Sequence, residues 1–325
     1  DKLAVPVAEL ERIVTGTWAR VSAEQVDPLA PVDSDLDGSL RARALQLLPP
    51  EIRDIPTVSP GSLYISADGF LSALPFETLN LASDGSYVPL LARWDVIYLR
   101  RSRSLFPAGA PATTGGLLVS NPALSPETRR RLSVSELLPG ASREVTDVAV
   151  LIKNATVLDG DDATKPGVVA MWESVPLVYV AAHFLAHPEI PFLTLLPLAG
   201  TESGTSPDAV LIDVGDVRAA DLRRCGLVVL SGCATGAPYV SRRVTGPSFG
   251  DAVLDAGARR VIQTFWSVDD DYAYRHVSDF FRLWKAGDES PARVLNQLRR
   301  DELDTPDGPV HPHYWAAFHV KDANL

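Results

Sequence analysis

Two apolar runs in the sequence each end at a side chain that can do chemistry. Residues 177–182, LVYVAA, lead to His183, and residues 227–232, LVVLSG, lead to Cys233. A continuous aliphatic run that stops at small residues is typical of a buried parallel strand, and ligands of open α/β sheets bind outside the carboxyl ends of such strands. If the two strands are neighbours, their ends lie roughly 5 Å apart, and the imidazole and the thiol share one rim.

A thiol beside an imidazole is a nucleophile beside its base. A free cysteine has a pKa of about 8.5, so only a small fraction is thiolate at neutral pH. Because an imidazole can take the proton or pair with the thiolate, His183 would activate Cys233 and then protonate a leaving amine. The backbone N–H groups of Cys233 and Phe184, at the two strand ends, would hold an oxyanion.

Each of these residues also has a purely structural interpretation. A cysteine beside a buried strand is usually a small hydrophobic residue, but the matched positions of the two side chains favour a site. Cys225 precedes its strand and is assigned to packing. His187 is an alternative base, and HFLAH has the spacing of a helical zinc pair, but Pro188 follows at once and no metal site is expected. His311 and His313 are interpreted as turn and surface residues.

The elements that would carry the site alternate from about residue 111. Five strand-like runs are mostly separated by segments with helical spacing: 116–121, 155–160, 177–183, 227–233 and 260–266. Among those segments, Ser248 and Asp251 form a capping-box pattern. The alternation predicts a doubly wound, mainly parallel α/β sheet with helices on both faces over residues 111–325.

Residues 1–110 are predicted to form an N-terminal flank. Val7, Leu10, Val14 and Val21 lie on one helical stripe. Asp68-Gly69 stands between two short apolar runs and predicts a β-hairpin. The stretch 107–116, rich in Pro, Ala and Gly, is typical of a linker and sets the boundary between flank and core.

Composition narrows the possible partners. The 325 residues carry a formal net charge of -11, which argues against nucleic acid and anionic membranes as partners. No apolar run approaches the roughly 20 residues that span a bilayer. Two cysteines do not make a disulfide framework, which favours reduced thiols and a cytoplasmic location. The chain begins at Asp1 and its single Met is Met171, so we expect a piece of a longer protein or a processed form.

Four segments of the chain carry a family resemblance. LSGCATG at 230–236 is similar to an L-S-A-C-x-T-G motif, and HFLAHPEIP at 183–191 to an H-F-A-T-H-G segment with downstream prolines. LPFETL at 74–79 is similar to L-P-F-E-A-L, and HPHYWAAF at 311–318 to H-P-x-x-W-A-A-F. In this order they resemble the motifs of the CHAT proteases, bacterial relatives of caspases and separases. The resemblance implies a caspase-like fold for the predicted core.

The resemblance also implies a cysteine endopeptidase that acts on a protein substrate without a cofactor. Cys233 would be the nucleophile and His183 the base, 50 residues apart as in caspase-like proteases. The family's Gly after the histidine is Phe184 here, and the residue after the cysteine, usually acidic or an amide, is Ala234. We expect both changes to tune catalysis. CHAT domains are commonly attached to domains that gate them, which implies a regulatory domain or an activator protein as partner.

Three consecutive acids close to Trp266 bear on specificity. In separases and several CHAT relatives an acidic residue in this neighbourhood binds the basic side chain before the cut bond, and Asp270 matches it better than Asp269 or Asp271. A carboxylate facing a guanidinium makes a bidentate, charge-assisted contact, so cleavage after Arg or Lys is expected. The alternatives are that the acids cap a helix and that Trp266 packs in the core instead of walling the pocket.

Other interpretations remain open at this stage. Arg242 and Arg243 are a candidate self-cleavage site if the specificity is basic, or plain surface arginines. The chain could be a catalytically silent CHAT-like interaction or signalling module. A nucleotide-binding domain is a third hypothesis. It is weakened because the segment after the first core strand, SNPALSPE at 120–127, lacks a glycine-rich phosphate loop.

Overall fold

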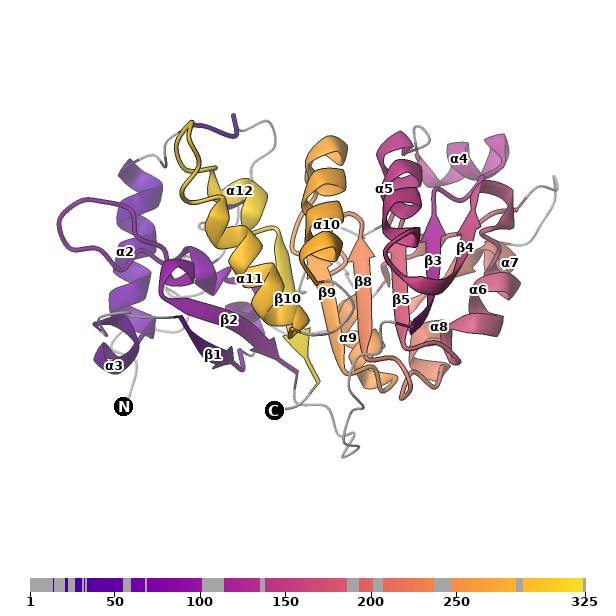
Figure 1. Ribbon diagram of the computed structural model, residues 1–325, viewed down its shortest axis with the longest axis horizontal. Helices are drawn as coiled ribbons and strands as arrows, with labels where there is room; N and C mark the ends of the chain where they lie inside the picture. The colour runs from indigo at the N-terminus through magenta and orange to yellow at the C-terminus, as the bar shows by residue number, and fades with distance from the viewer. Residues whose placement is uncertain are drawn as a thin grey trace.

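One sheet of eight strands organises the chain, in the spatial order β1-β2-β10-β9-β8-β5-β3-β4 (Figure 1). The computed structural model describes residues 14, 21–22, 27–30, 32, 34–54, 60–67, 69–100, 114–134, 138–185, 193–200, 207–236, 247–284 and 289–323. The strands of the sheet are β1 (Gly61–Ile65), β2 (Trp94–Leu99), β3 (Thr114–Ser120), β4 (Lys153–Asp159), β5 (Leu177–Ala181), β8 (Leu227–Ser231), β9 (Arg260–Thr264) and β10 (Phe318–Asp322). A separate antiparallel pair consists of β6 (Leu196–Pro197) and β7 (Leu211–Ile212).

Helices connect most of the strands. They are α2 (Ser34–Leu47), α3 (Pro50–Arg53), α4 (Pro126–Leu132), α5 (Pro139–Ala149), α6 (Lys165–Trp172), α7 (Pro207–Val210), α8 (Val214–Ala219), α9 (Phe249–Asp255), α10 (Asp270–Trp284), α11 (Pro291–Asp301) and α12 (Pro312–Trp315). Short 3-10 turns are η1 (Gly69–Ala73), η2 (Phe76–Thr78), η3 (Leu90–Ala92) and η4 (Gly160–Asp162). None of the helices in the described ranges has the length and apolar character of a membrane span.

The predicted parallel core is confirmed. Strands β9, β8, β5, β3 and β4 pair in parallel, and each of the five predicted runs forms one of them. β10 is antiparallel to β9 and parallel to β2. The chain therefore has a mainly parallel sheet with one antiparallel junction among its described strands.

Alternation along the strands sends side chains to two separate hydrophobic clusters. On β5, Leu177 and Tyr179 pack on one face, whereas Val178 and Val180 pack on the other. Helices α5, α10 and α11 cover the first face and lie in front of the sheet in Figure 1, whereas α6, α8 and α9 cover the second. Successive side chains of a strand point to opposite faces, so a strand buried on both sides needs a continuous apolar run.

The flank joins this sheet, but the predicted hairpin is wrong. β1 runs parallel to β2, and the chain after β1 forms η1 and η2. Leu74 and Phe76 of the second apolar run are buried in the core cluster, and Pro75 between them has no N–H to give to a ladder. Of the predicted linker, only the residues that begin β3 lie in the described ranges. The division at residues 110 and 111 stays a prediction.

A buried ion pair ties the flank to the rest of the chain. Glu77, in the LPFE segment, pairs with Arg299 of α11, and both side chains are fully buried. The Tyr98 hydroxyl of β2 donates to the same carboxylate, and Arg299 also donates to the Trp315 carbonyl at 3.0 Å. Removing one partner of such a pair leaves a buried charge uncompensated, which typically costs about 3–5 kcal/mol. The pair fixes the flank against α11 and α12.

Candidate active site

The register of two neighbouring strands brings the candidate dyad together. β5 and β8 pair in parallel with Ala181 opposite Ser231, so His183 and Cys233 each come two residues beyond a paired position. Both line one cleft of about 100 Å³. Cys233 is partly exposed there. The prediction that the two side chains share one rim of the sheet is therefore confirmed.

Close packing holds the two strand ends against each other. A Cβ on Gly232 would lie 2.2 Å from the Phe184 ring and 2.6 Å from the Ala182 carbonyl oxygen, so only glycine fits there. The Thr264 hydroxyl of β9 donates to the Gly232 carbonyl. Ala234 follows Cys233 with a φ of 53°, in the left-handed region. The turn that presents the thiol is therefore fixed on both sides.

Phe184, which stands where the family has Gly, is accommodated by the core. Its side chain is buried and meets Phe249 of α9 edge to face, with ring centroids 5.1 Å apart. The bulk of the ring is thus directed into the cluster beneath α9. Its backbone N–H remains at the end of β5, where the sequence predicts an oxyanion donor.

The three consecutive acids have three different surroundings. Asp270 lines the cleft with the dyad, and its Oδ2 accepts a hydrogen bond from the Gly140 N–H of α5 at 2.9 Å. Asp269 caps α10, because its Oδ1 accepts from the N–H groups of Asp271 and Tyr272 at 3.1 Å. The exposed Asp271 pairs with Arg143 at 3.2 Å. Helix capping thus accounts for Asp269, and only Asp270 of the three lines the cleft.

Trp266 is both a wall and a core residue. It lines the cleft, yet only 5% of its surface is exposed. Its indole N–H donates to the His313 carbonyl at 2.8 Å. The two interpretations of this residue are therefore compatible.

Glu144 of α5 is a cleft residue that sequence reasoning missed. It is 2% exposed and lines the cleft with Asp270 and Ser231. Burial, followed by the nearby Asp270 charge, raises the pKa of its carboxyl well above the usual range, against a lowering hydrogen bond with Ser231. A signal was present, since Glu144 lies three residues after Ala141 and four before Val148 on the buried stripe of α5.

The remaining predicted residues are either outside the described ranges or buried. His187, Arg242 and Arg243 lie outside the described residues. Cys225 is buried, which raises the pKa of its thiol to about 12 and confirms its packing role.

The surface assignment of His311 and His313 is wrong, because both are buried. The Nδ1 of His311 caps α12 by accepting from the His313 N–H at 3.1 Å. His313 stacks on Trp266, with ring centroids 6.2 Å apart. The prediction of a turn is also wrong, because His311 is the N-cap of α12 and His313 lies within that helix.

A comparison with known protein families identifies the family of this chain. The model of the CHAT domain matches residues 37–322. The chain belongs to the CHAT domain family. Its sheet, with helices on both faces, has the caspase-like fold expected of that family. No relative was found among the curated proteins.

Several solved structures are similar to this CHAT domain. The separase of the Saccharomyces cerevisiae separase–securin complex matches with 13% identity and a TM-score of 0.46, over 77% of this chain and 14% of that one. The Arg specific cysteine proteinase gingipain R matches with 9% identity and a TM-score of 0.48, over 97% and 74%. The Porphyromonas gingivalis RgpB complex of pro- and mature domains gives 8% identity and a TM-score of 0.47, over 97% and 76%. The chain thus spans about one seventh of the separase chain.

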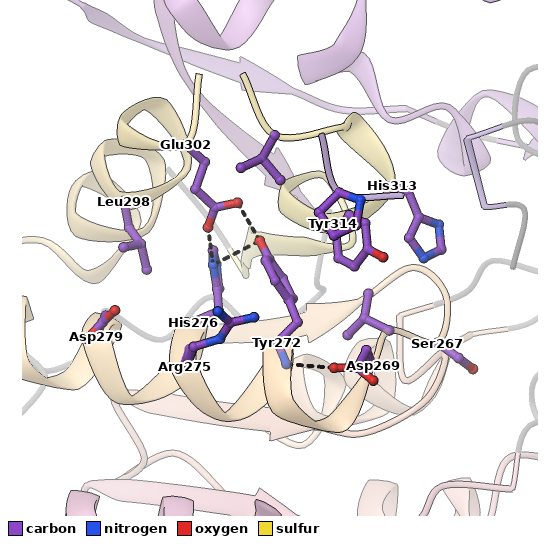
Figure 2. Close-up of a pocket in the computed structure, with 13 residues that line it drawn as sticks. Ser267, Asp269, Tyr272, Arg275, His276, Asp279, Leu298, Glu302, His313 and Tyr314 are labelled. Carbon is purple, nitrogen blue, oxygen red and sulfur yellow. Dashed lines mark hydrogen bonds and ion pairs between the residues drawn. The ribbon is translucent and has the colours of Figure 1, made fainter. Parts of the chain in front are cut away.

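A larger pocket of the CHAT domain, about 710 Å³, lies beside α10 and is lined by α10, α11 and α12 (Figure 2). Three of its polar side chains form a hydrogen-bonded network. The Tyr272 hydroxyl donates to Glu302 at 2.6 Å, and His276 Nδ1 lies 2.8 Å from the other oxygen of the same carboxylate. Of the predicted residues, Asp269 lies here and the dyad does not.

Proposed function

We propose that this CHAT domain is a cysteine endopeptidase with Cys233 as nucleophile and His183 as general base. The observation that carries the proposal is the β5–β8 register, which gives the two residues equivalent positions at one cleft. Under the alternative hypothesis of a catalytically silent interaction module, that register would have no role.

The chemistry follows from these positions. His183 takes the thiol proton, and the thiolate attacks the scissile carbonyl to form a tetrahedral oxyanion. The backbone N–H groups of Cys233 and Phe184 are proposed to stabilise that oxyanion. His183 then protonates the leaving amine, which leaves an acyl group on Cys233. A water molecule, deprotonated by His183, hydrolyses the thioester and restores the thiol.

We place Asp270 in the pocket for the residue before the cut bond. Its carboxylate is anchored by the Gly140 N–H and lines the same cleft as the dyad. A fixed carboxylate binds a guanidinium or ammonium better than a neutral side chain. The preferred peptide therefore has Arg or Lys at this position.

We also propose that a partner domain or proteolysis controls access to the cleft, and that the protein works in the reducing bacterial cytoplasm, where Cys233 stays a thiol. A cleft of about 100 Å³ is small beside typical ligand pockets of about 300–1,000 Å³, which supports gating. If Arg242 or Arg243 is a self-cleavage site, N-terminal sequencing after prolonged incubation should find a new terminus directly after it. The absence of such a terminus contradicts self-cleavage there.

Labelling tests the proposed dyad directly. An Arg-directed acyloxymethyl ketone should add once to the wild type, not at all to Cys233→Ala, and more slowly to His183→Ala, as measured by intact mass. An Asp-directed probe is the control for charge preference. If neither probe labels a folded wild type, alone or with candidate activators, the silent module is the better assignment.

A further inference from the structure

The cleft holds a second carboxyl group besides Asp270. Glu144 projects from α5, whereas Asp270 begins α10, so the two acids reach the cleft from different helices. Glu144 is 2% exposed, and its Oε1 has no hydrogen-bond partner among the described residues. The carboxyl hydrogen-bonds to the Ser231 hydroxyl. An acid buried with one oxygen unused is costly unless something else supplies a partner.

The charges around Glu144 do not supply that partner. The titratable side chains that line the cleft with it are Asp270, His183 and Cys233. The Asp270 charge acts against ionisation of Glu144, as burial does. The neighbouring charged residues of α5 are engaged elsewhere: Arg143 pairs with Asp271, and Asp147 accepts from Tyr274 and pairs with Arg282.

We propose that Glu144 is a specificity-determining residue that, together with Asp270, receives the end of a basic substrate side chain in the cleft. The proposal rests on the proposed function, because it assigns the basic residue before the cut bond to this cleft. A guanidinium has five N–H donors on a planar fork and can serve two carboxyls at once, whereas an ammonium is a point charge with three donors. Glu144 therefore favours Arg over Lys.

Binding is then coupled to a proton. The empty cleft holds Glu144 as a carboxylic acid beside the Asp270 carboxylate. Entry of a cation favours the ionised form of Glu144, so its proton leaves to the solvent as the cation binds. Because one proton is released for each cation bound, affinity for an Arg side chain rises with pH until Glu144 is ionised in the empty cleft. A cation bound by a permanently neutral group would show no such rise.

The test measures binding to the Cys233→Ala protein, so it does not depend on turnover. The probes are two peptides, acetyl-Ala-Ala-Ala-Arg-amide and its twin with neutral citrulline, titrated by calorimetry at pH 6 and pH 8 in two buffers of different ionisation enthalpy. The Arg peptide should bind at least about tenfold tighter than the citrulline peptide and release a proton. In the double variant with Cys233→Ala and Glu144→Gln, the affinity for the Arg peptide should be about tenfold lower. The proton release seen with Cys233→Ala alone should be absent.

Matched variants separate this role from a structural one. Glu127→Gln, at a partly exposed acid of α4, should change neither affinity nor proton release. Glu144→Asp keeps the titrating group and should keep the pH dependence with weaker binding, and it also serves if Glu144→Gln does not fold. A Lys peptide should lose less than the Arg peptide in Glu144→Gln.

The outcomes distinguish the two proposals. Unchanged Arg affinity and proton release in folded Glu144→Gln, or no binding of the Arg peptide at all, overturns the role of Glu144. If Glu144→Gln leaves affinity and proton release unchanged but the wild type hydrolyses Arg peptides, the proposed peptidase stands and only the role of Glu144 fails. If Arg peptides bind in a Glu144-dependent manner but the wild type never cleaves or labels, the pocket stands and the proposed peptidase fails.

Discussion

The two pockets beside α10 differ in size and in the state of their polar groups. The larger, about 710 Å³, contains a Tyr272–Glu302–His276 network, in which His276 Nδ1 is bonded and His276 Nε2 is buried without a partner among the described residues (Figure 2). The smaller, about 100 Å³, contains a thiol, an imidazole and two acids, one of them buried with an unused oxygen. Neither volume nor a buried polar atom without a partner therefore distinguishes the candidate site. A thiol and an imidazole that line the same cleft do.

Helix α10 serves both pockets through its periodicity. Asp270 and Ala273 face the cleft, whereas Tyr272, His276 and Asp279 face the larger pocket. Residues three and four apart share a face of a helix, so one helix can present two unrelated surfaces. A variant on one face therefore tests its own pocket, with the other face as the control.

The largest expected difference between the pockets is in catalysis. Cys233→Ala and His183→Ala should each lower the rate of Arg-peptide hydrolysis by about a thousandfold or more, because nucleophile and base act as a unit. Glu302→Gln should leave the rate within about twofold, since that carboxyl faces the other pocket. Steady-state kinetics of the three purified variants check this. Loss of activity in a folded Glu302→Gln protein would move the site to the larger pocket.

Asp270 should show the next largest effect. Asp270→Asn removes the anchored negative charge and should lower kcat/KM for Arg peptides by about a hundredfold, with little change for Leu peptides. The neighbouring Asp271→Asn is the matched control, because its exposed ion pair contributes at most about 1 kcal/mol to stability and does not reach the cleft. Equal losses in the two variants would contradict the assignment of Asp270.

For stability, a change in the larger pocket should have a clear effect even though catalysis is unaffected. Tyr272→Phe removes a hydroxyl that donates to Glu302 at 2.6 Å and should lower the free energy of unfolding by about 1–2 kcal/mol. The rate of hydrolysis should stay unchanged. Urea unfolding followed by circular dichroism measures the first quantity, and an unchanged midpoint would show that the network contributes nothing.

The smallest effect concerns pH. The raised pKa of Glu144 means that the folded state holds its proton more tightly than the unfolded chain does. Stability is therefore fully present below the ordinary carboxyl pKa of 4.5 and falls as pH rises from there toward the folded pKa. Relative to the wild type, Glu144→Gln should gain stability between pH 5 and pH 8. Thermal unfolding at both values checks this, and a parallel shift of both proteins would argue against a protonated Glu144.

Much of the fold and the shared position of His183 and Cys233 could be predicted because the signals are local. The five core strands are apolar runs bounded by small or turn residues, and Ser248 with Asp251 forms the expected capping box at α9. The equivalence of His183 and Cys233 needed only the inference that their strands are neighbours, which the register confirms.

The misses come from contacts between distant segments. Asp68-Gly69 predicts a hairpin locally, but β1 finds a parallel partner in β2, about 30 residues on. Glu144 gained its surroundings from Ser231 and Asp270, on other elements. The surface assignment of His313 missed its stacking on Trp266. No pattern within a single segment of the sequence encodes these contacts between distant segments.

The place of β10 between β2 and β9 has a consequence for the order of folding. β2 ends at Leu99, yet its second neighbour in the sheet begins only at Phe318. A ribosome adding about 5–20 residues per second needs roughly 10 to 40 seconds to make the intervening chain. During that interval β2 has one side without its native partner, while the five parallel strands β3, β4, β5, β8 and β9 are synthesised. The sheet is therefore closed last at its middle, by β10, which follows the other described strands of the sheet along the chain.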